Sequence, residues 1–297
     1  MAHKKAGILS PGDKVKGTYK VKFFLGEGAF GEVYQVEHNF LNLQVMKVFK
    51  EKYVKNSDLD TLMNEARILT TLTHENLVRV FEANHFSNNG KKHYYLTLNH
   101  VSGEPLAKRL ERDIKLDVDL ALSIQLDVLE ALSYVHNQSS SIVHRDINPD
   151  NILLSYEDEG IVGKLSDFGL AQSIGQMDEI TNAAGRFLYF APECFWGSYL
   201  PTSDVFSAGI VFYRMLTGVF PWSYNLSGLN GYSKDLEKQI RISRNKKPRN
   251  PSVYTSSISP ELDGVVLKSL ELSIEDRYRN AEEFLNDLKN IKSNLSQ

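Results

Sequence analysis

Apolar and polar residues alternate over most of the first hundred positions of the chain. The alternating runs are rich in β-branched and aromatic side chains, which favours half-buried strands. The predicted strands cover residues 18–28, 31–38, 43–50, 77–86 and 91–101. A different periodicity interrupts them at residues 57–72, where apolar side chains recur three or four positions apart and predict an amphipathic helix. We therefore expect a strand-rich first region with one principal helix.

Helical spacing dominates the rest of the chain. Residues 119–138 place their apolar side chains on one helical face, as does a final helix that begins at Asn280. Residues 203–218 are apolar nearly all round, which predicts a helix inside a core that ends at Gly218. The resulting prediction is an α+β, bilobal fold with a cleft suited to a ligand. Its parts are an N-terminal extension (1–18), a small antiparallel-sheet lobe (19–98), a hinge (99–103) and a larger, mostly helical lobe (104–297).

Composition and charge exclude several classes of protein. The formal net charge of −3 gives no global attraction to nucleic acid or to an anionic membrane. The most apolar stretch, residues 208–222, is short and contains Arg214, so it predicts a buried helix instead of a membrane span. The start of the chain lacks the apolar core of a signal peptide, and the single cysteine, Cys194, suits a reducing cytoplasm. We expect a cytoplasmic protein with no nucleic-acid or membrane partner, and its oligomeric state stays open.

Gly26, Gly28 and Gly31 form a G-x-G-x-x-G pattern between two predicted strands. A dinucleotide-binding fingerprint would need a helix after the glycines, whereas a glycine loop between antiparallel strands can close over phosphates with its amides. A glycine-rich hairpin without a ligand is the alternative. Lys47 lies in a predicted strand, where burial of an unpaired ammonium would be costly, and Glu65 on the helix is its candidate partner. A surface lysine and a solvated glutamate are the alternative here.

The stretch "HRDINPDNILL", residues 144–154, carries a more specific signal. Asp146 and Asn151 stand ahead of a predicted strand, and Asp167 follows in "LSDFGLA". Short oxygen-bearing side chains are the ligands that suit Mg²⁺ bound together with phosphate oxygens. Two unrelated polar turns are the alternative, but this combination of motif and spacing makes chance a poor explanation.

Together these motifs resemble the catalytic domain of eukaryotic-type protein kinases, in particular the serine/threonine kinases, and residues 276–288 have a bacterial character. The resemblance runs from about Tyr19 to Leu288. The matching elements, in chain order, are the glycine loop (Gly26–Gly31), Lys47, Glu65, the catalytic loop (His144–Asn151), D-F-G (Asp167–Gly169), A-P-E (Ala191–Glu193), Asp204 and Arg277.

The resemblance implies an ATP- and Mg²⁺-dependent enzyme that transfers the γ-phosphoryl group to serine or threonine hydroxyls of proteins, with autophosphorylation included. It implies that Lys47, held by Glu65, contacts the phosphates, that Asn151 and Asp167 hold Mg²⁺, and that Asp146 accepts the substrate proton. His100 would belong to the hinge that lines the adenine pocket. The implied nucleotide-binding residues are Leu25, Gly26, Glu27, Gly28, Ala29, Phe30, Gly31, Val33, Val45, Lys47, Leu98, Asn99, Val101 and Leu153.

Two departures from the family surround the catalytic aspartate. Asn148 replaces a lysine, and Arg186 replaces a threonine that in the family lies beside that lysine. Our hypothesis is that Arg186 is catalytic and supplies the γ-phosphate contact of the missing lysine. The alternatives are a solvated or substrate-facing Arg186 in a slow enzyme, and a pseudokinase that acts as a nucleotide-binding scaffold. A small-molecule kinase is a third alternative, which the glycine loop and the A-P-E segment make less attractive.

Regulation and docking are less constrained by the sequence. Thr181 and Ser173 are candidate phosphate acceptors, while Asp178 and Glu179 could act as permanent anions, so we expect activity without loop phosphorylation. The basic run at residues 241–252 is interpreted as a solvated loop, with a docking surface for an acidic substrate segment as the alternative.

Overall fold

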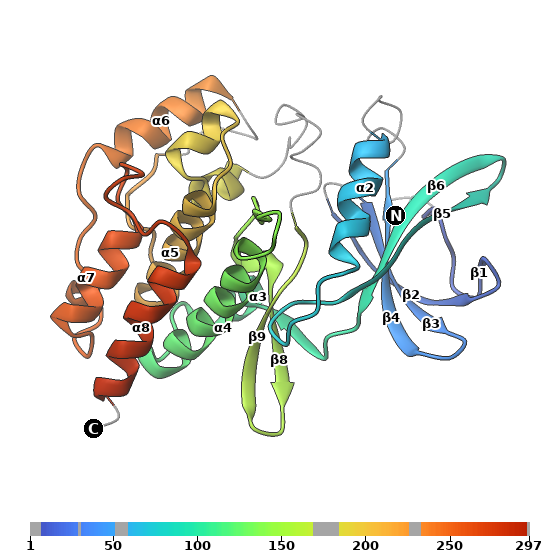
Figure 1. The fold of residues 1–297 in the computed structure, drawn as a ribbon, viewed down its shortest axis with the longest axis horizontal. Helices are drawn as coiled ribbons and strands as arrows, with labels where there is room; N and C mark the ends of the chain where they lie inside the picture. The colour runs from blue at the N-terminus through green and yellow to red at the C-terminus, as the bar shows by residue number, and fades with distance from the viewer. Residues whose placement is uncertain (1–6, 29–30, 51–58, 169–183, 226–232, 296–297) are drawn as a thin grey trace, which may run out of the picture. The chain divides into compact units, whose positions relative to one another are not determined.

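The computed structural model describes residues 7–28, 31–50, 59–168, 184–225 and 233–295. These residues form two compact units (Figure 1). The first contains the described residues from 7 to 73 and residues 78–101, and the second contains residues 74–77 and the described residues from 102 onward. The assignment of residues 74–77 to the second unit was not expected from the sequence. The exact lobe and hinge boundaries stay a prediction.

A six-stranded antiparallel sheet forms most of the first unit, in the order β1-β2-β3-β4-β6-β5. The strands are β1 (Lys14–Val15), β2 (Tyr19–Glu27), β3 (Gly31–His38), β4 (Asn42–Phe49), β5 (Val80–Asn88) and β6 (Lys91–Asn99). Tyr34 and Val36 of β3 are fully buried while their neighbours are partly exposed, as a strand with one face on a core requires. The predicted strands are confirmed, with ends displaced by a few residues.

Helix α2 (Leu59–Leu69) packs against β5 and confirms the predicted helix of this unit. It buries Met63, Ala66 and Leu69, as the periodicity required. The helix ends earlier than predicted because the hydroxyls of Thr70 and Thr71 donate to carbonyls of its last turn, each at 2.7 Å. Residues 57 and 58, at the start of the predicted helix, lie outside the described residues.

Glu82 of β5 is a charged group inside the first unit. Its carboxylate accepts hydrogen bonds from the hydroxyls of Tyr19 (2.6 Å) and Tyr95 (3.0 Å) and from the amide of Asn84 (2.6 Å). Burial alone raises the pKa of this carboxyl, but the three hydrogen bonds favour the charged form, and the net effect lowers the pKa.

The second unit combines a small sheet with a set of packed helices. The sheet has the order β7-β8-β9, with strands β7 (Gly103–Pro105), β8 (Ile152–Glu157) and β9 (Gly160–Leu165). The described helices are α3 (Leu106–Asp113), α4 (Val118–His136), α5 (Pro201–Thr217), α6 (Lys234–Arg244), α7 (Pro260–Ser269) and α8 (Ala281–Leu295). Helices α4, α5 and α8 pack side by side (Figure 1).

Helix α5 lies inside this core, as its sequence predicted. Nearly every residue along it is buried, on all sides. It ends at Gly218, whose φ of 77° places it in the left-handed region that glycine adopts without a steric penalty. The predicted helices 119–138, 203–218 and the one from Asn280 are thus confirmed as α4, α5 and α8.

A buried ion pair joins the A-P-E segment to the end of the chain. Nη1 of Arg277 lies 2.8 Å from Oε1 of Glu193, and the same carboxylate accepts a hydrogen bond from the hydroxyl of Ser203 at 2.7 Å. The side chain of Arg277 is 0% exposed and that of Glu193 is 9% exposed. Arg277 occupies the place where, in the family that the motifs resemble, an arginine pairs with the A-P-E glutamate, and the geometry shows that pair here.

The interpretation of residues 241–252 as a solvated loop is wrong for its first four residues, which form the last turn of α6. Ser233 caps the start of that helix and Leu236 and Ile240 bury one side of it. Arg244 is buried and donates to the carbonyls of Leu188 (2.8 Å) and Phe190 (2.7 Å). The helical pattern of α6 was not recognised in the sequence because Arg244, a charged residue, occupies a buried position on the apolar side of the helix.

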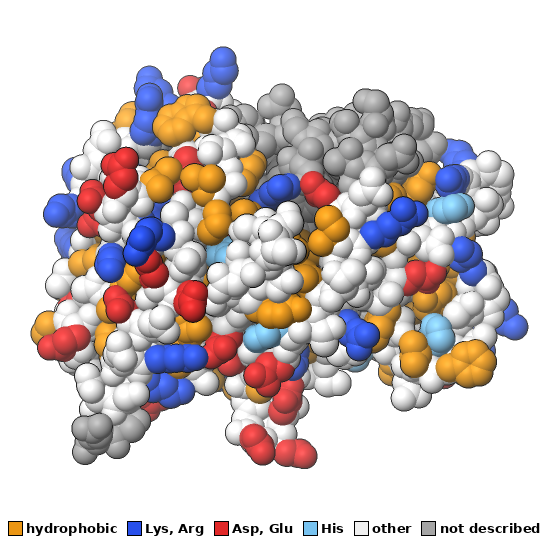
Figure 2. Space-filling view, viewed as in Figure 1, with side chains coloured by type: hydrophobic (Ala, Val, Ile, Leu, Met, Phe, Trp, Pro, Cys, Tyr) orange, Lys and Arg blue, Asp and Glu red, His pale blue; other side chains and the backbone are white. Residues whose placement is uncertain are grey.

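Lys/Arg and Asp/Glu side chains are scattered among uncharged ones over the described surface in the view of Figure 2. Acidic side chains gather at the tip of the β8–β9 hairpin, where Glu157, Asp158 and Glu159 are exposed (Figure 2). None of the described helices combines the length and the apolar character that a membrane span requires.

Candidate active site

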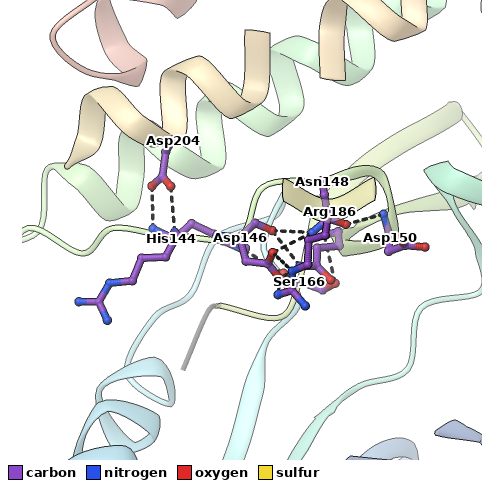
Figure 3. Close-up of polar contacts among 9 residues, drawn as sticks. His144, Asp146, Asn148, Asp150, Ser166, Arg186 and Asp204 are labelled. Carbon is purple, nitrogen blue, oxygen red and sulfur yellow. Dashed lines mark hydrogen bonds and ion pairs between the residues drawn. The ribbon is translucent and has the colours of Figure 1, made fainter. Parts of the chain in front are cut away.

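The loop that begins at His144 is fixed by a carboxylate from α5 (Figure 3). Asp204 is 1% exposed and accepts hydrogen bonds from the backbone N–H groups of His144 (2.6 Å) and Arg145 (2.9 Å). Nε2 of His136 lies 3.0 Å from the same carboxylate. Arg145 has a φ of 71°, a conformation that a non-glycine residue keeps only where its surroundings hold it. Asp204 therefore sets the backbone from which the next residue projects.

Asp146 receives four side-chain hydrogen bonds (Figure 3). Oδ1 accepts from Nδ2 of Asn148 at 3.0 Å and from Nε of Arg186 at 2.5 Å. Oδ2 accepts from Nδ2 of Asn151 at 2.5 Å and from Nη2 of Arg186. An ionised carboxylate offers about four lone-pair positions, so these donors saturate it. The group is 4% exposed, and the bonds compensate for its burial.

Arg186 reaches Asp146 from η4 (Ala184–Tyr189), a 3₁₀ helix ahead of the A-P-E segment. The two-point contact has the geometry that makes arginine–carboxylate pairs specific. Its side chain is 17% exposed, against 4% for Asp146, so it is the more accessible partner of the pair.

The strand end that carries Asp167 is tied to the same loop. The N–H of Ser166 donates to the carbonyl of Asn151 at 2.8 Å, and Nε2 of His144 lies 2.9 Å from the carbonyl of Ser166. Asp167 itself has a φ of 55°, again in the left-handed region. These bonds bring the segment ends at Asn151 and Ser166, next to Asp167, together in one part of the second unit.

Burial and neighbouring charges shift two groups of this loop. Burial lowers the pKa of His144, which favours the neutral imidazole. The ring therefore serves to hold the loop by hydrogen bonds and not as a charged group. Partial desolvation by the surrounding protein, reinforced by the nearby Asp146 carboxylate, raises the pKa of Asp150, although this residue is exposed at the surface. Asn148 accepts a hydrogen bond from the N–H of Asp150 at 2.9 Å, so it caps η1 (Pro149–Asn151) as well as contacting Asp146.

Asn151 and Asp167 offer oxygen donors that fit Mg²⁺. Because Nδ2 of Asn151 donates to Asp146, its amide oxygen is the atom that can coordinate a cation. Among the described residues no group of three or more His, Cys, Asp or Glu side chains could hold a metal by itself. This is compatible with Mg²⁺ chemistry, since that ion is often bound by one or two protein ligands together with phosphate oxygens and water.

The glycine loop lies in the first unit, between the end of β2 and the start of β3. The N–H of Gly28 donates to the carbonyl of Gly31 at 2.8 Å. A Cβ on Gly31 would lie 2.3 Å from the carbonyl oxygen of Val48, so only glycine allows β3 to approach β4 here. Ala29 and Phe30, which were predicted to bind nucleotide, lie outside the described residues, as do Gly169, Ser173, Asp178, Glu179 and Thr181.

The structure gives the positions of the remaining predicted nucleotide-binding residues but does not test their contacts with a nucleotide. Lys47 stands opposite Val33 in the β3–β4 ladder, and Val45 stands opposite Leu98 in the β4–β6 ladder. Asn99 ends β6, and Leu153 lies in β8 of the second unit. The pairing of Lys47 with Glu65 and the contacts of Leu25 and Val101 with a nucleotide stay predictions.

Sequence reasoning missed the direct pairing of Arg186 with Asp146. It also missed the amide contacts that Asn148 and Asn151 make to the same carboxylate. The signal that could have revealed the ion pair was the relocation of a positive charge from residue 148 to residue 186, which we had assigned to a phosphate contact instead.

Comparison with known proteins agrees with this geometry. The sequence model described as "Protein kinase domain" matches residues 19–288, so the chain belongs to the protein kinase domain family. A probable serine/threonine-protein kinase of Clostridium perfringens is 30% identical over 285 residues, which is 94% of this chain and 39% of that protein. A calcium/calmodulin-dependent protein kinase type II of Caenorhabditis elegans is 32% identical over 218 residues, covering 72% of this chain and 29% of its own length.

Solved structures show the same fold. The kinase domain of PknI from Mycobacterium tuberculosis superposes with a TM-score of 0.71 at 23% identity, over 95% of this chain and 98% of its own. A Rad53 structure in complex with AMP-PNP gives a TM-score of 0.70 at 26% identity, over 91% of this chain and 64% of that one. The predicted bilobal kinase-like α+β fold is therefore confirmed. Three bacterial probable serine/threonine-protein kinases, that of Clostridium perfringens among them, match 93–95% of this chain, and the chain spans about two fifths of their length.

Proposed function

We propose that the chain is the catalytic domain of an ATP- and Mg²⁺-dependent protein kinase that phosphorylates serine or threonine residues. The observation that carries the proposal is the buried Asp146, held by Asn148, Asn151 and Arg186 on a loop that Asp204 fixes. Phosphoryl transfer depends on positioning and on charge neutralisation more than on covalent chemistry, and this loop is built for both. We include a protein substrate and a cytoplasmic location, which the single cysteine suits.

Each residue has a defined task under this proposal. Asp146 orients the acceptor hydroxyl and takes its proton, while Asn151 and Asp167 supply oxygen atoms to Mg²⁺. The glycine loop and Lys47, which Glu65 would orient, hold the phosphates. Magnesium would offset the negative charge on the transferring phosphate.

We further propose that Arg186 provides the cation that the family places at residue 148. Its guanidinium already lies against Asp146 together with the amide of Asn148. Because Asp146 is saturated in this arrangement, catalysis requires one of its donors to withdraw and make room for the acceptor hydroxyl. Arg186 is the more accessible partner of the ion pair, and the γ-phosphate is an anion that could draw its guanidinium away.

Incubation with labelled ATP, Mg²⁺ and a generic protein substrate tests the activity, and mass-spectrometric phosphosite mapping identifies the acceptor residues. Asp146→Ala should abolish incorporation, while Asp158→Ala at the exposed β8–β9 turn should leave it intact. Equal incorporation by the wild type and Asp146→Ala, or phosphate only on tyrosine, would contradict the proposal.

The saturation of Asp146 also favours a second candidate, a pseudokinase that binds nucleotide without transferring phosphate. In that case Arg186 would hold Asp146 permanently. Calorimetric titration with ATP·Mg²⁺ separates the two candidates when it is combined with the incorporation assay. Nucleotide binding without incorporation above the Asp146→Ala level would favour the pseudokinase.

A further inference from the structure

Lys50 contacts the glycine loop from the end of β4. Its Nζ lies 2.8 Å from Oε1 of Glu27 and 2.8 Å from the carbonyl oxygen of Gly28. The N–H of Gly28 is also engaged, since it donates to the carbonyl of Gly31. Both backbone polar groups of this central glycine are therefore held by protein atoms.

The charges around the loop explain why a cation is needed at this position. Glu27 lies directly opposite Glu32 in the β2–β3 ladder, and like charges that face each other across strands are destabilising. Lys50 neutralises Glu27. Glu32 accepts hydrogen bonds from the N–H of Ile8 at 2.7 Å and from the hydroxyl of Tyr34. Each carboxylate at the base of the loop thus has its own compensating partner.

We propose that Lys50 is a positioning residue that holds the glycine loop ready for the phosphates of ATP. The inference rests on the proposed function. A glycine-rich segment loses more conformational freedom on ordering than any other, so loop ordering opposes phosphate binding. A contact that fixes Gly28 before the nucleotide arrives reduces this cost. Lys50 acts through the loop backbone and not by touching the nucleotide, which distinguishes it from Lys47.

The test measures dissociation constants for ATP·Mg²⁺ and, separately, for adenosine, by calorimetry. Lys50→Met should weaken ATP·Mg²⁺ binding about fivefold, the scale expected for losing an exposed ion pair and a charge-assisted hydrogen bond. Adenosine binding should stay the same, because adenosine has no phosphates for the loop to hold. Lys50→Arg should restore most of the ATP affinity, since a guanidinium can reach both acceptors.

Lys22→Met provides a matched control. Lys22 and Glu37 form another ion pair between lysine and glutamate in the same sheet, at 3.1 Å, with side chains 34% and 50% exposed against 28% and 53% for Lys50 and Glu27. The Lys22–Glu37 pair lies outside the glycine loop, so its loss should leave ATP affinity unchanged.

In steady-state assays Lys50→Met should raise KM for ATP more than it lowers kcat.

The outcomes separate this inference from the proposed function. Normal ATP·Mg²⁺ affinity in Lys50→Met overturns the positioning role while the kinase proposal stands. An equal loss of ATP and adenosine binding also overturns it, because the substitution would then act on the unit as a whole. Failure of the wild type to bind ATP·Mg²⁺ overturns both.

Discussion

Asp146 takes its positive partner from residue 186 instead of residue 148, and exchanging the two residues tests whether the position of that charge matters. Three variants are needed: Arg186→Thr, Asn148→Lys and the double variant. The guanidinium makes two of the four hydrogen bonds that Asp146 accepts from side chains. Breaking a buried ion pair by removing one partner lowers the free energy of unfolding by about 3–5 kcal/mol, and by less here because Arg186 is partly exposed.

The effect on turnover comes instead from the proposed contact of Arg186 with the γ-phosphate. Removal of one transition-state donor costs about 2–4 kcal/mol. At about 1.4 kcal/mol for each factor of ten, Arg186→Thr should lower kcat by about 30- to 1,000-fold. Asn148→Lys alone should also impair the enzyme, since an ammonium and a guanidinium would compete for one carboxylate. The double variant should recover to within about tenfold of the wild type, as the charge returns to residue 148.

The assay is kcat with labelled ATP at saturating substrate, and urea unfolding of each variant separates loss of fold from loss of catalysis. Arg112→Thr removes an exposed arginine that also makes a two-point contact, to Glu104, and should leave kcat unchanged. Unimpaired turnover in Arg186→Thr would refute the compensation argument. A double variant no better than the worse single variant would also refute it.

Three further predictions concern stability and reactivity. Arg277→Met leaves Glu193 buried without its charge partner and should lower the free energy of unfolding, measured in urea, by about 3–5 kcal/mol. Arg279→Met, which removes an exposed ion pair, should change it by less than about 0.5 kcal/mol. Equal effects of the two substitutions would contradict the view that the Arg277–Glu193 pair stabilises the core. The folded-state pKa of Glu82 is lowered, so its stabilising contribution is present above its unfolded pKa and is lost as pH falls through its folded pKa. The difference in unfolding free energy between the wild type and Glu82→Gln should therefore be larger at pH 7 than at pH 3, and a difference independent of pH would argue against this linkage. Burial raises the pKa of Cys194 to about 12, so the native thiol should resist a disulfide reagent at pH 8 and react only after unfolding; rapid native reaction would show that it is accessible.

Local periodicity predicted the main elements well because each was specified by its own segment. Alternation identified β3 and β4, and the all-round apolar character of residues 203–218 identified α5 as a core helix. Catalytic-loop positions were recognisable because the motif is contiguous. The buried end of α6 was missed because Arg244 is charged, and its role depends on carbonyls more than 50 residues away in the chain.

Contacts between distant residues account for what the sequence did not predict in the site. Arg186 and Asp146 are 40 positions apart, so no periodicity relates them. Lys50 and Gly28 are 22 positions apart and are joined only because β2, β3 and β4 fold back on one another. The sequence supplied the chemistry of these residues, whereas the partner of each side chain depends on the tertiary fold.

The burial of Arg244 affects the active site as well as helix α6. Its buried guanidinium lies over the rings of Phe206 and Trp222 and donates to the carbonyls of Leu188 and Phe190, just after Arg186 in the chain. The backbone that presents Arg186 is thus anchored to a helix far from it in the chain, so the reach of that guanidinium depends on core packing. Random mutagenesis screened for activity should therefore recover lesions in α6 that mimic active-site damage while leaving every residue of the site intact.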